Sequence, residues 1–465
     1  MSMTTEVTQI LHQVAPEITW FFTALLAAMI LSLALEEKIH AKKSIIVGAF
    51  AIVSLFLGTA LHIIPFGNVI LPGGHAIEMP VYVPAIDWGV IAIIVGSSLF
   101  VDVTSRSGLF SWIAIKLTKL SGGDPLKLLW YYGLMTVLFS AVLNNVTAMI
   151  IVGSLTAVSL SKLKQKNLLL GFLLTEGLLT NIGGLLTLIS SVPNIIIGHA
   201  ANISFVDFFL KSSPFVLVAT IATIYLSTRI FSIQALKSNE EKQQAEYLIS
   251  SFDENDGIES NRFFWFASIM LVLFIIAIAT ASITPVARDL GMGFVALSFA
   301  AIMLLRYKAE VDEFYRSIDW DLIGFFMALF VVINVMEHAQ VLELIGDGIH
   351  YIIGEQLSLF GTSILLISSA IASSVTDNIP LAAMLSKILV ASHTPESSPL
   401  WWSVVFGANL GGNITPIGSA STLVAVTIIH KHQLHLSFVD FVKKALPFAL
   451  MHIVLATAYV LLFLY

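Results

Sequence analysis

Apolar runs of about 20 residues recur along almost the whole chain, and a helix needs about that length to cross the hydrocarbon core of a bilayer. Of the 465 residues, 57% are hydrophobic and only 11% are charged. Soluble domains carry about 25% charged residues. The sequence therefore predicts an all-α polytopic membrane protein, with the lipid bilayer as its permanent partner.

The composition also argues against several classes of function. The chain contains no cysteine, which rules out disulfides, thiolate metal sites and cysteine catalysis. The formal net charge is −7 and no basic tract stands out, so we expect no nucleic-acid partner. Neither a P-loop nor a Ser-His-Asp frame is present. We therefore expect no enzyme, and no cofactor beyond coupling ions such as Na⁺ or H⁺.

Four short polar stretches interrupt the apolar runs, and they occur as two similar pairs. Residues 144–147 (Asn-Asn-Val-Thr) pair with 181–184 (Asn-Ile-Gly-Gly), and residues 376–380 (Thr-Asp-Asn-Ile-Pro) pair with 409–412 (Asn-Leu-Gly-Gly). A broken backbone hydrogen bond is costly at membrane depth, because lipid offers no other partner. Such stretches persist where they face protein or a water-filled cavity, which makes them candidates for an ion site.

The charges that flank the apolar runs predict two halves of the same design. The first repeat is 1–228, with a re-entrant hairpin at about 128–161 and a broken helix at about 168–199. A cytoplasmic linker, 229–262, leads to the second repeat, 263–465, with a hairpin at about 356–392 and a broken helix at about 400–428. Short loops rich in Lys and Arg stay cytoplasmic, which predicts both termini outside.

An odd number of crossings per half makes the second half an inverted repeat, with about 10 transmembrane helices in all. The repeat is visible in the letters: residues 86–88 and 318–320 both read Ile-Asp-Trp. Residues 181–191 and 409–419 share the frame N-[IL]-G-G-x-[LI]-T-x-I-x-S. Inverted repeats with discontinuous helices place a binding site at their interface.

The repeated polar residues are the candidates for binding an ion or substrate. They are Asn144, Asn145, Thr147, Asn181, Gly183, Gly184, Thr187, Thr376, Asp377, Asn378, Asn409, Gly411, Gly412, Thr415 and Ser419. Amide, hydroxyl and freed carbonyl oxygens are hard ligands suited to Na⁺, whereas the N-termini of broken helices suit an anion. Close helix packing is the alternative role for the glycines, and helix capping is the alternative for the asparagines.

Two carboxyl groups are candidate proton carriers. Asp377 lies in a mostly apolar run, where a carboxylate is expensive and tends to be functional; capping a helix is its alternative role. Glu176 precedes the first break, and a purely structural polar contact is its alternative. Asp102 and Glu337 lie near the ends of apolar runs, where we expect the membrane interface.

These motifs resemble the ion transporter superfamily, in particular ArsB-type arsenite permeases and NhaD-type sodium/proton antiporters. Residues 36–44, 143–147, 181–184, 193–198, 376–380 and 411–419 carry the resemblance. It implies a homodimer of scaffold and transport parts with an elevator-like movement. It also implies one Na⁺ between Asn145 and Gly183-Gly184, and a second between Asn378 and Gly411-Gly412.

The sequence thus favours a secondary active transporter for a small inorganic ion in the inner (plasma) membrane, with elevator-type alternating access and Na⁺ (or Li⁺) exchanged for H⁺. An efflux permease for arsenite or another small oxyanion is one alternative, and a Na⁺-coupled dicarboxylate transporter is another. A channel with the hairpins as its filter is a third.

Overall fold

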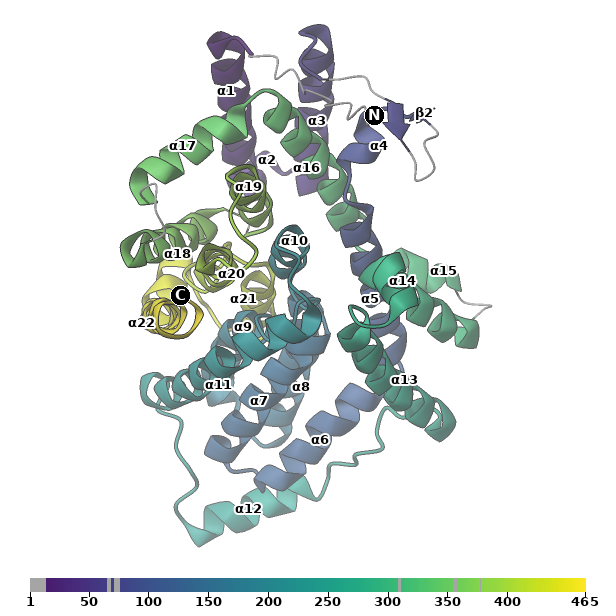
Figure 1. Cartoon of the computed structure of the whole chain (residues 1–465). Helices are drawn as coiled ribbons and strands as arrows, with labels where there is room; N and C mark the ends of the chain where they lie inside the picture. The colour runs from purple at the N-terminus through teal and green to yellow at the C-terminus, as the bar shows by residue number, and fades with distance from the viewer. Residues whose placement is uncertain (1–13, 65–67, 71–75, 308–310, 354–357, 377) are drawn as a thin grey trace. The chain divides into compact units, whose positions relative to one another are not determined.

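The structure, a computed structural model, describes residues 14–64, 68–70, 76–307, 311–353, 358–376 and 378–465. Within these ranges the chain is almost entirely helical (Figure 1), and its two strands, β1 (Asn68–Ile70) and β2 (Ala76–Glu78), form one short antiparallel pair. Ten of the described helices are long and apolar enough to cross a membrane. The expected all-α polytopic membrane fold is confirmed.

The chain divides into two compact units, and the first comprises residues 1–87 and 324–348. It holds α1 (Pro16–Ala34), α2 (Glu36–Ile39), α3 (Lys43–Ala60), α4 (Tyr82–Ala85), most of α16 (Trp320–His338) and the start of α17 (Val341–Ile353). A Cβ added at Gly58 of α3 would lie 3.3 Å from Val335 of α16. A helix from the second half of the chain thus packs closely on one from the first, through a small residue.

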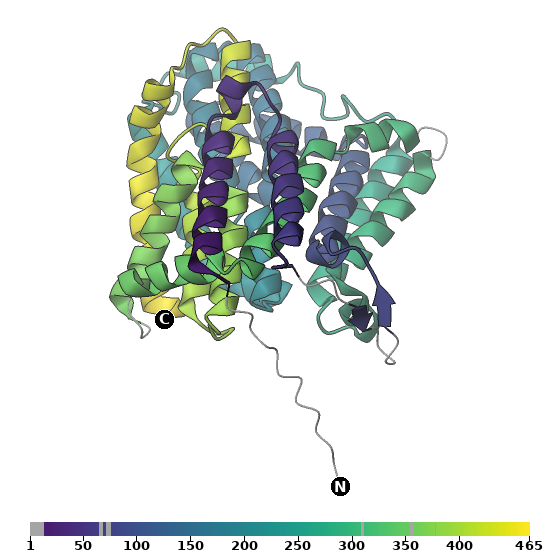
Figure 2. The ribbon, with the colours of Figure 1, turned by 90° about the horizontal axis from the view of Figure 1, so that it is seen from above.

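The second unit comprises residues 88–323 and 349–465. Its first members in chain order are α5 (Trp88–Ser105), α6 (Leu109–Ser121), α7 (Pro125–Val142), α8 (Asn145–Lys162), α9 (Leu169–Gly183), α10 (Val192–Ala200), α11 (Phe205–Ile230) and α12 (Asn239–Ile249). The later members are α13 (Asn261–Thr280), α14 (Pro285–Leu304), α15 (Val311–Ser317), α18 (Leu359–Val375), α19 (Asn378–Ala391), α20 (Pro399–Gly411), α21 (Ala420–Lys431) and α22 (Phe438–Tyr459). Figure 2 shows the long helices of each unit running side by side.

Within the second unit, α5 packs tightly on α13 and α14, which follow the linker. A Cβ added at Gly96 of α5 would lie 2.5 Å from the backbone of Ala296 in α14, and one at Gly293 of α14 would lie 2.7 Å from the Cβ of Ala92. Phe100 of α5 stacks on Phe274 of α13, with ring centroids 4.4 Å apart. Glycine at the crossing lets the two backbones approach, as is common between membrane helices.

Helix pairs occupy both predicted hairpins, and both predicted broken helices are interrupted. The hairpins are α7–α8 and α18–α19, and the broken helices are α9–α10 and α20–α21. The ten candidate spans include α7 and α8, of 18 residues each, but neither broken helix, whose pieces have 9 to 15 residues. The number of spans therefore matches the expectation, although the set differs. The predicted site residue Asp377 lies outside the described residues.

The linker is folded and packs against the ends of α6 and α7 (Figure 1). Ser238 and Glu241 form a capping box at the start of α12, which satisfies donors that a helix start leaves open. The backbone N–H of Leu236 donates to Asp124 Oδ2 at 2.9 Å. Glu254 pairs with Lys119 of α6, and the hydrogen bond from Lys119 lowers the pKa of Glu254 to about 2.

Candidate functional site

The two asparagines of the first hairpin tip have different roles. Asn144 Oδ1 accepts a hydrogen bond from the backbone N–H of Thr147 at 2.8 Å, so its side chain caps α8. Asn145 joins the tip to the break: its Oδ1 accepts from Ser140 at 2.7 Å, and its Nδ2 donates to Asn181 Oδ1 at 3.4 Å. Capping therefore describes Asn144 here, whereas Asn145 makes a tertiary contact.

Glycine is required where the tip meets the first break. A Cβ added at Gly184 would lie 2.6 Å from Asn145 Oδ1, and one at Gly183 would lie 2.6 Å from the carbonyl oxygen of Val137 in α7. A Cβ added at Gly411 would likewise collide with the carbonyl oxygen of Ala370 in α18. At Gly412, an added Cβ would lie 2.8 Å from the Cβ of Ser419. The glycines thus allow each break to lie directly against its neighbours.

Corresponding hydrogen bonds in the two halves hold each helix break to the hairpin of its own half. Thr187 donates to the backbone carbonyl of Ala141 in α7, and Thr415 donates to that of Ser374 in α18, both at 2.5 Å. Ser140 and Ser373 donate at 2.6 Å to the carbonyls of Thr180 and Ala408. A buried carbonyl near a helix end needs such a donor where no N–H of its own helix reaches it; the Thr180 carbonyl also accepts from the N–H of Gly184 at 2.8 Å. Corresponding residues of the two halves therefore form the same contacts between break and hairpin.

A second set of bonds crosses between the two breaks. Ser191 donates to Asn409 Oδ1 at 2.7 Å, and Ser419 donates to Asn181 Oδ1 at 2.9 Å. Because Ser191 corresponds to Ser419 and Asn181 to Asn409, the two bonds are reciprocal, as a two-fold relation between the halves requires. The network extends outward: Asn181 Nδ2 donates to Asn413 Oδ1 at 2.8 Å, and Asn409 Nδ2 donates to Asn194 Oδ1 at 2.9 Å.

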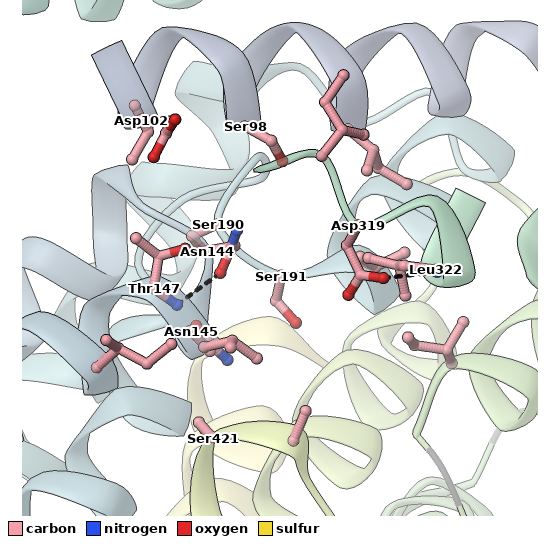
Figure 3. Close-up of a pocket in the computed structure, with 18 of the residues that line it drawn as sticks. Ser98, Asp102, Asn144, Asn145, Thr147, Ser190, Ser191, Asp319, Leu322 and Ser421 are labelled. Carbon is pink, nitrogen blue, oxygen red and sulfur yellow. Dashed lines mark hydrogen bonds between the residues drawn. The ribbon is translucent and has the colours of Figure 1, made fainter. Parts of the chain in front are cut away.

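A cavity of about 490 Å³ adjoins this network, and its lining lies within the second compact unit. Figure 3 shows the polar side chains around it. Both tips and both breaks contribute polar residues, and so does α5. The described polar lining residues are Asn144, Asn145, Thr147, Asn378, Ser190, Ser191, Ser419, Ser421, Ser98, Asp102, Ser105 and Asp319. No Lys, Arg or His occurs among the described residues that line it.

The two carboxylates among the described residues of this cavity, Asp102 and Asp319, were not among the predicted site residues. Asp102 was expected at the membrane interface, but it lines the cavity because α5 packs against α10 of the first broken helix. Asp319 Oδ1 also accepts from the backbone N–H of Leu322 at 3.0 Å. The repeated Ile-Asp-Trp motif could have indicated Asp319 as a site residue. No pattern in the sequence indicates that Asp102 lies near the hairpin tips.

Several predicted residues support the cavity without lining it. Asn181, Gly183, Gly184, Thr187, Asn409, Gly411, Gly412 and Thr415 are buried or nearly so and hold the breaks in place. Thr376 donates to the carbonyl of Ala372 at 2.8 Å, within its own hairpin arm. The Na⁺ positions between tips and breaks stay a prediction.

Glu176 and His452 are ionisable side chains with 0% exposure that lie outside the cavity lining. Glu176, in α9, accepts a hydrogen bond from Thr156 at 2.5 Å. His452, in α22, was not predicted: its Nε2 lies 2.7 Å from Thr223 Oγ1 and its Nδ1 lies 3.3 Å from Asn413 Nδ2. A histidine inside the last predicted span was the only signal for it.

The described residues contain no group of three or more His, Cys, Asp or Glu side chains that could hold a metal ion. The cavity instead offers carboxylate, amide and hydroxyl oxygens. Oxygen ligands of this kind suit hard cations rather than the transition metals that favour imidazole or thiolate.

Comparison with known proteins places these features among membrane transporters. A family model described as a citrate transporter, CitMHS, matches residues 33–407. The "46 kDa membrane protein" of Mycobacterium leprae is 30% identical over 379 residues, which are 80% of this chain and 86% of that protein. The "P protein" of Mus musculus is 26% identical, over 94% of this chain and 62% of that protein.

A solved structure supports the same fold. The YdaH transporter of Alcanivorax borkumensis, described as having an unusual topology, aligns with a TM-score of 0.51 and 13% identity, over 90% of this chain and 98% of that one. The resemblance to permeases is therefore confirmed at the level of the class, and the matched family is the citrate transporter family rather than the ArsB/NhaD group.

Proposed function

Because the chain belongs to the citrate transporter (CitMHS) family and is an integral membrane transporter, we propose that it is a secondary active transporter that binds a small cation in the cavity between the hairpin tips. In this proposal Na⁺ or Li⁺ is exchanged for H⁺. An elevator-like movement carries the tips and breaks from one side of the membrane to the other, within a homodimer whose chain termini lie outside.

The charge of the cavity is the observation that carries the proposal. Asp102 and Asp319 line it, and the described lining residues include no Lys, Arg or His. In surroundings of low effective dielectric, two carboxylates attract a cation strongly and repel an anion. The amide and hydroxyl groups of Asn145, Asn378 and Ser191 provide the oxygen atoms that replace part of the hydration shell of the ion.

Transport by purified protein in liposomes tests this proposal. A pH gradient is imposed, and its dissipation is followed after addition of Na⁺, Li⁺ or K⁺. We expect dissipation with Na⁺ or Li⁺ but not with K⁺, and its loss in the double variant D102N/D319N. Asn retains a capping oxygen at position 319, so folding should persist, and E246Q on the exposed side of α12 is the control. Dissipation indifferent to Na⁺ and Li⁺ would refute the exchange.

Transport of citrate or a related organic anion is the second candidate, and the family match favours it. A bare tricarboxylate would meet Asp102 and Asp319 without any basic partner among the described lining residues. Such an anion would therefore need accompanying cations to enter this cavity. Uptake of labelled citrate with and without added cations separates this candidate from ion exchange, and arsenite in the same assay tests the oxyanion alternative.

A further inference from the structure

Glu176 is a fully buried carboxyl group, and one of its two oxygens accepts no hydrogen bond from the described residues. Its side chain is 0% exposed, and Thr156 of α8 donates to its Oε1 at 2.5 Å. Its Oε2 has no hydrogen-bond partner among the described residues. Buried charges are normally paired or bound to a metal, and no basic side chain among the described residues bonds to Glu176. A carboxyl that carries a proton avoids that cost.

The neighbours of Glu176 are polar but offer no positive charge. Tyr132 of α7 is close enough to interact electrostatically with it. Helix α21 contributes the methyl group of Ala425 beside Gly177, and α11 contributes Ser227, bonded to Thr175 at 2.8 Å. The segments packed on α9 carry Asp, Glu, Lys, Arg or His residues only within two turns of their ends, and none of these residues bonds to Glu176. They are Lys127, Lys162, Lys166, Asp207, Lys211, Arg229, His430 and Lys431.

A chain of hydroxyl groups leads from Glu176 toward the linker. Thr156 contacts the carboxyl, and Ser159 lies one turn further along α8, on the same face. The Ser159 hydroxyl lies 2.8 Å from the hydroxyl of Tyr132, which lies 2.8 Å from Thr118 Oγ1 of α6. Thr118 precedes Lys119, the partner of Glu254 in the linker. Two steps of this chain are not hydrogen-bonded: the helical turn between Thr156 and Ser159, and the last step from the buried Thr118 hydroxyl to the linker.

We propose that Glu176 binds the proton that is exchanged for the cation, and that the hydroxyls of Thr156, Ser159, Tyr132 and Thr118 connect it to the linker side. This inference rests on the proposed exchange and adds its proton site. Glu176 lies five residues before Asn181 in α9, about 7.5 Å along the axis at about 1.5 Å per residue. Asn181 in turn accepts a hydrogen bond from Asn145, which lines the cavity. A cation in the cavity attracts an ionised Glu176 and so favours release of its proton, and protonation weakens cation binding by the same factor.

Proton release on cation binding tests the site directly. Na⁺ is added to the detergent-purified protein in weak buffer with a pH indicator, and Na⁺ binding is followed separately by thermal stabilisation. Wild type should release protons, and its apparent Kd for Na⁺ should rise at least about fivefold from pH 8 to pH 6, the lower end of typical coupling factors. E176Q should still bind Na⁺, with less than twofold change over that range and no proton release. E246Q is the control.

A matched pair of variants, Y132F and Y131F, tests the proposed proton route. Y132F removes the central hydroxyl of the chain, whereas Y131F removes a neighbouring hydroxyl outside it. The rate of proton release, measured by stopped flow, should fall in Y132F and stay unchanged in Y131F. Equal rates of proton release in the two variants would overturn the proposed route. Proton release by E176Q equal to wild type, at unchanged Na⁺ affinity, would overturn the site. Na⁺ binding by wild type without any proton release would instead refute the proposed exchange itself.

Discussion

Replacing Ser191 by Ala should destabilise the protein more than replacing Ser421 by Ala, although both changes delete one buried hydroxyl. Ser191 is the sole donor to Asn409 Oδ1 among the described residues, so S191A leaves a buried acceptor unpaired. Asn181 Oδ1 accepts from both Ser419 and Ser421, so it keeps a donor in S421A.

The expected losses of stability differ because S191A leaves a buried acceptor unpaired, whereas S421A removes one of several donors. An unsatisfied buried polar group costs about 1–3 kcal/mol, whereas the net value of one hydrogen bond is about 0.5–1.5 kcal/mol. We therefore expect the free energy of unfolding to fall by about 2 kcal/mol in S191A and about 1 kcal/mol in S421A. The two changes are the same in the unfolded chain, so the difference reports the folded network.

Equilibrium unfolding in mixed detergent micelles, with SDS as denaturant and tryptophan fluorescence as the signal, measures both values; the chain has 8 Trp residues. Ser191→Thr, which retains the hydroxyl, serves as the control and should recover most of the loss. Equal destabilisation by the two alanine variants, or a larger effect of S421A, would refute the reciprocal bonding between the breaks.

Three further predictions concern packing, the meeting of the tips, and the linker. Gly183→Ala should cost about 1–3 kcal/mol in the same unfolding assay, because its Cβ would lie 2.6 Å from the Val137 carbonyl oxygen, whereas G48A, with nothing within 4 Å, should cost nothing. In this chain without cysteine, N145C and N378C placed together should be joined by a short flexible thiol cross-linker, and either alone should not. The pKa of Glu254, about 2 when folded against an ordinary 4.5, should add stability above pH 4.5 that is lost as the pH falls toward 2; E254Q should abolish this acid-dependent part of the thermal midpoint, and a midpoint profile identical to wild type would contradict it.

The sequence allowed the hairpins and broken helices to be predicted because their signals are local. Residues 181–184 and 409–412 interrupt apolar runs, and α9 and α20 end at Gly183 and Gly411. Helix-breaking glycines and the cost of unsatisfied backbone in lipid act on the chain itself. The repeat then indicated which breaks correspond, without knowledge of their contacts.

The carboxylates of the cavity and the histidine could not be predicted in the same way. Asp102 reaches the cavity because α5 packs on α10, and His452 becomes part of the network because α22 packs on α20. Neither contact leaves a periodic or spaced pattern in one sequence. The packing of α5 on α14 is equally non-local, since Gly96 of α5 faces Ala296 and Gly293 of α14 faces Ala92, on helices that the linker separates in the chain.

The asparagines show how far a motif determines a role. Asn144 and Asn145 are adjacent and identical, yet one caps α8 and the other contacts the break. The difference arises because Asn144 precedes the first helical residue while Asn145 lies on the face that meets Gly184. A sequence indicates that a polar tip exists, whereas the packing of the helix decides which side chain faces the site.

Saturable binding of ²²Na⁺ to the purified protein is the most direct test of whether the cavity holds a cation. We expect binding that Li⁺ and protons displace but K⁺ does not, and that disappears in D102N/D319N while E246Q binds like wild type. No saturable binding by wild type, or binding that survives loss of both carboxylates, would contradict the assignment of this cavity as the ion site.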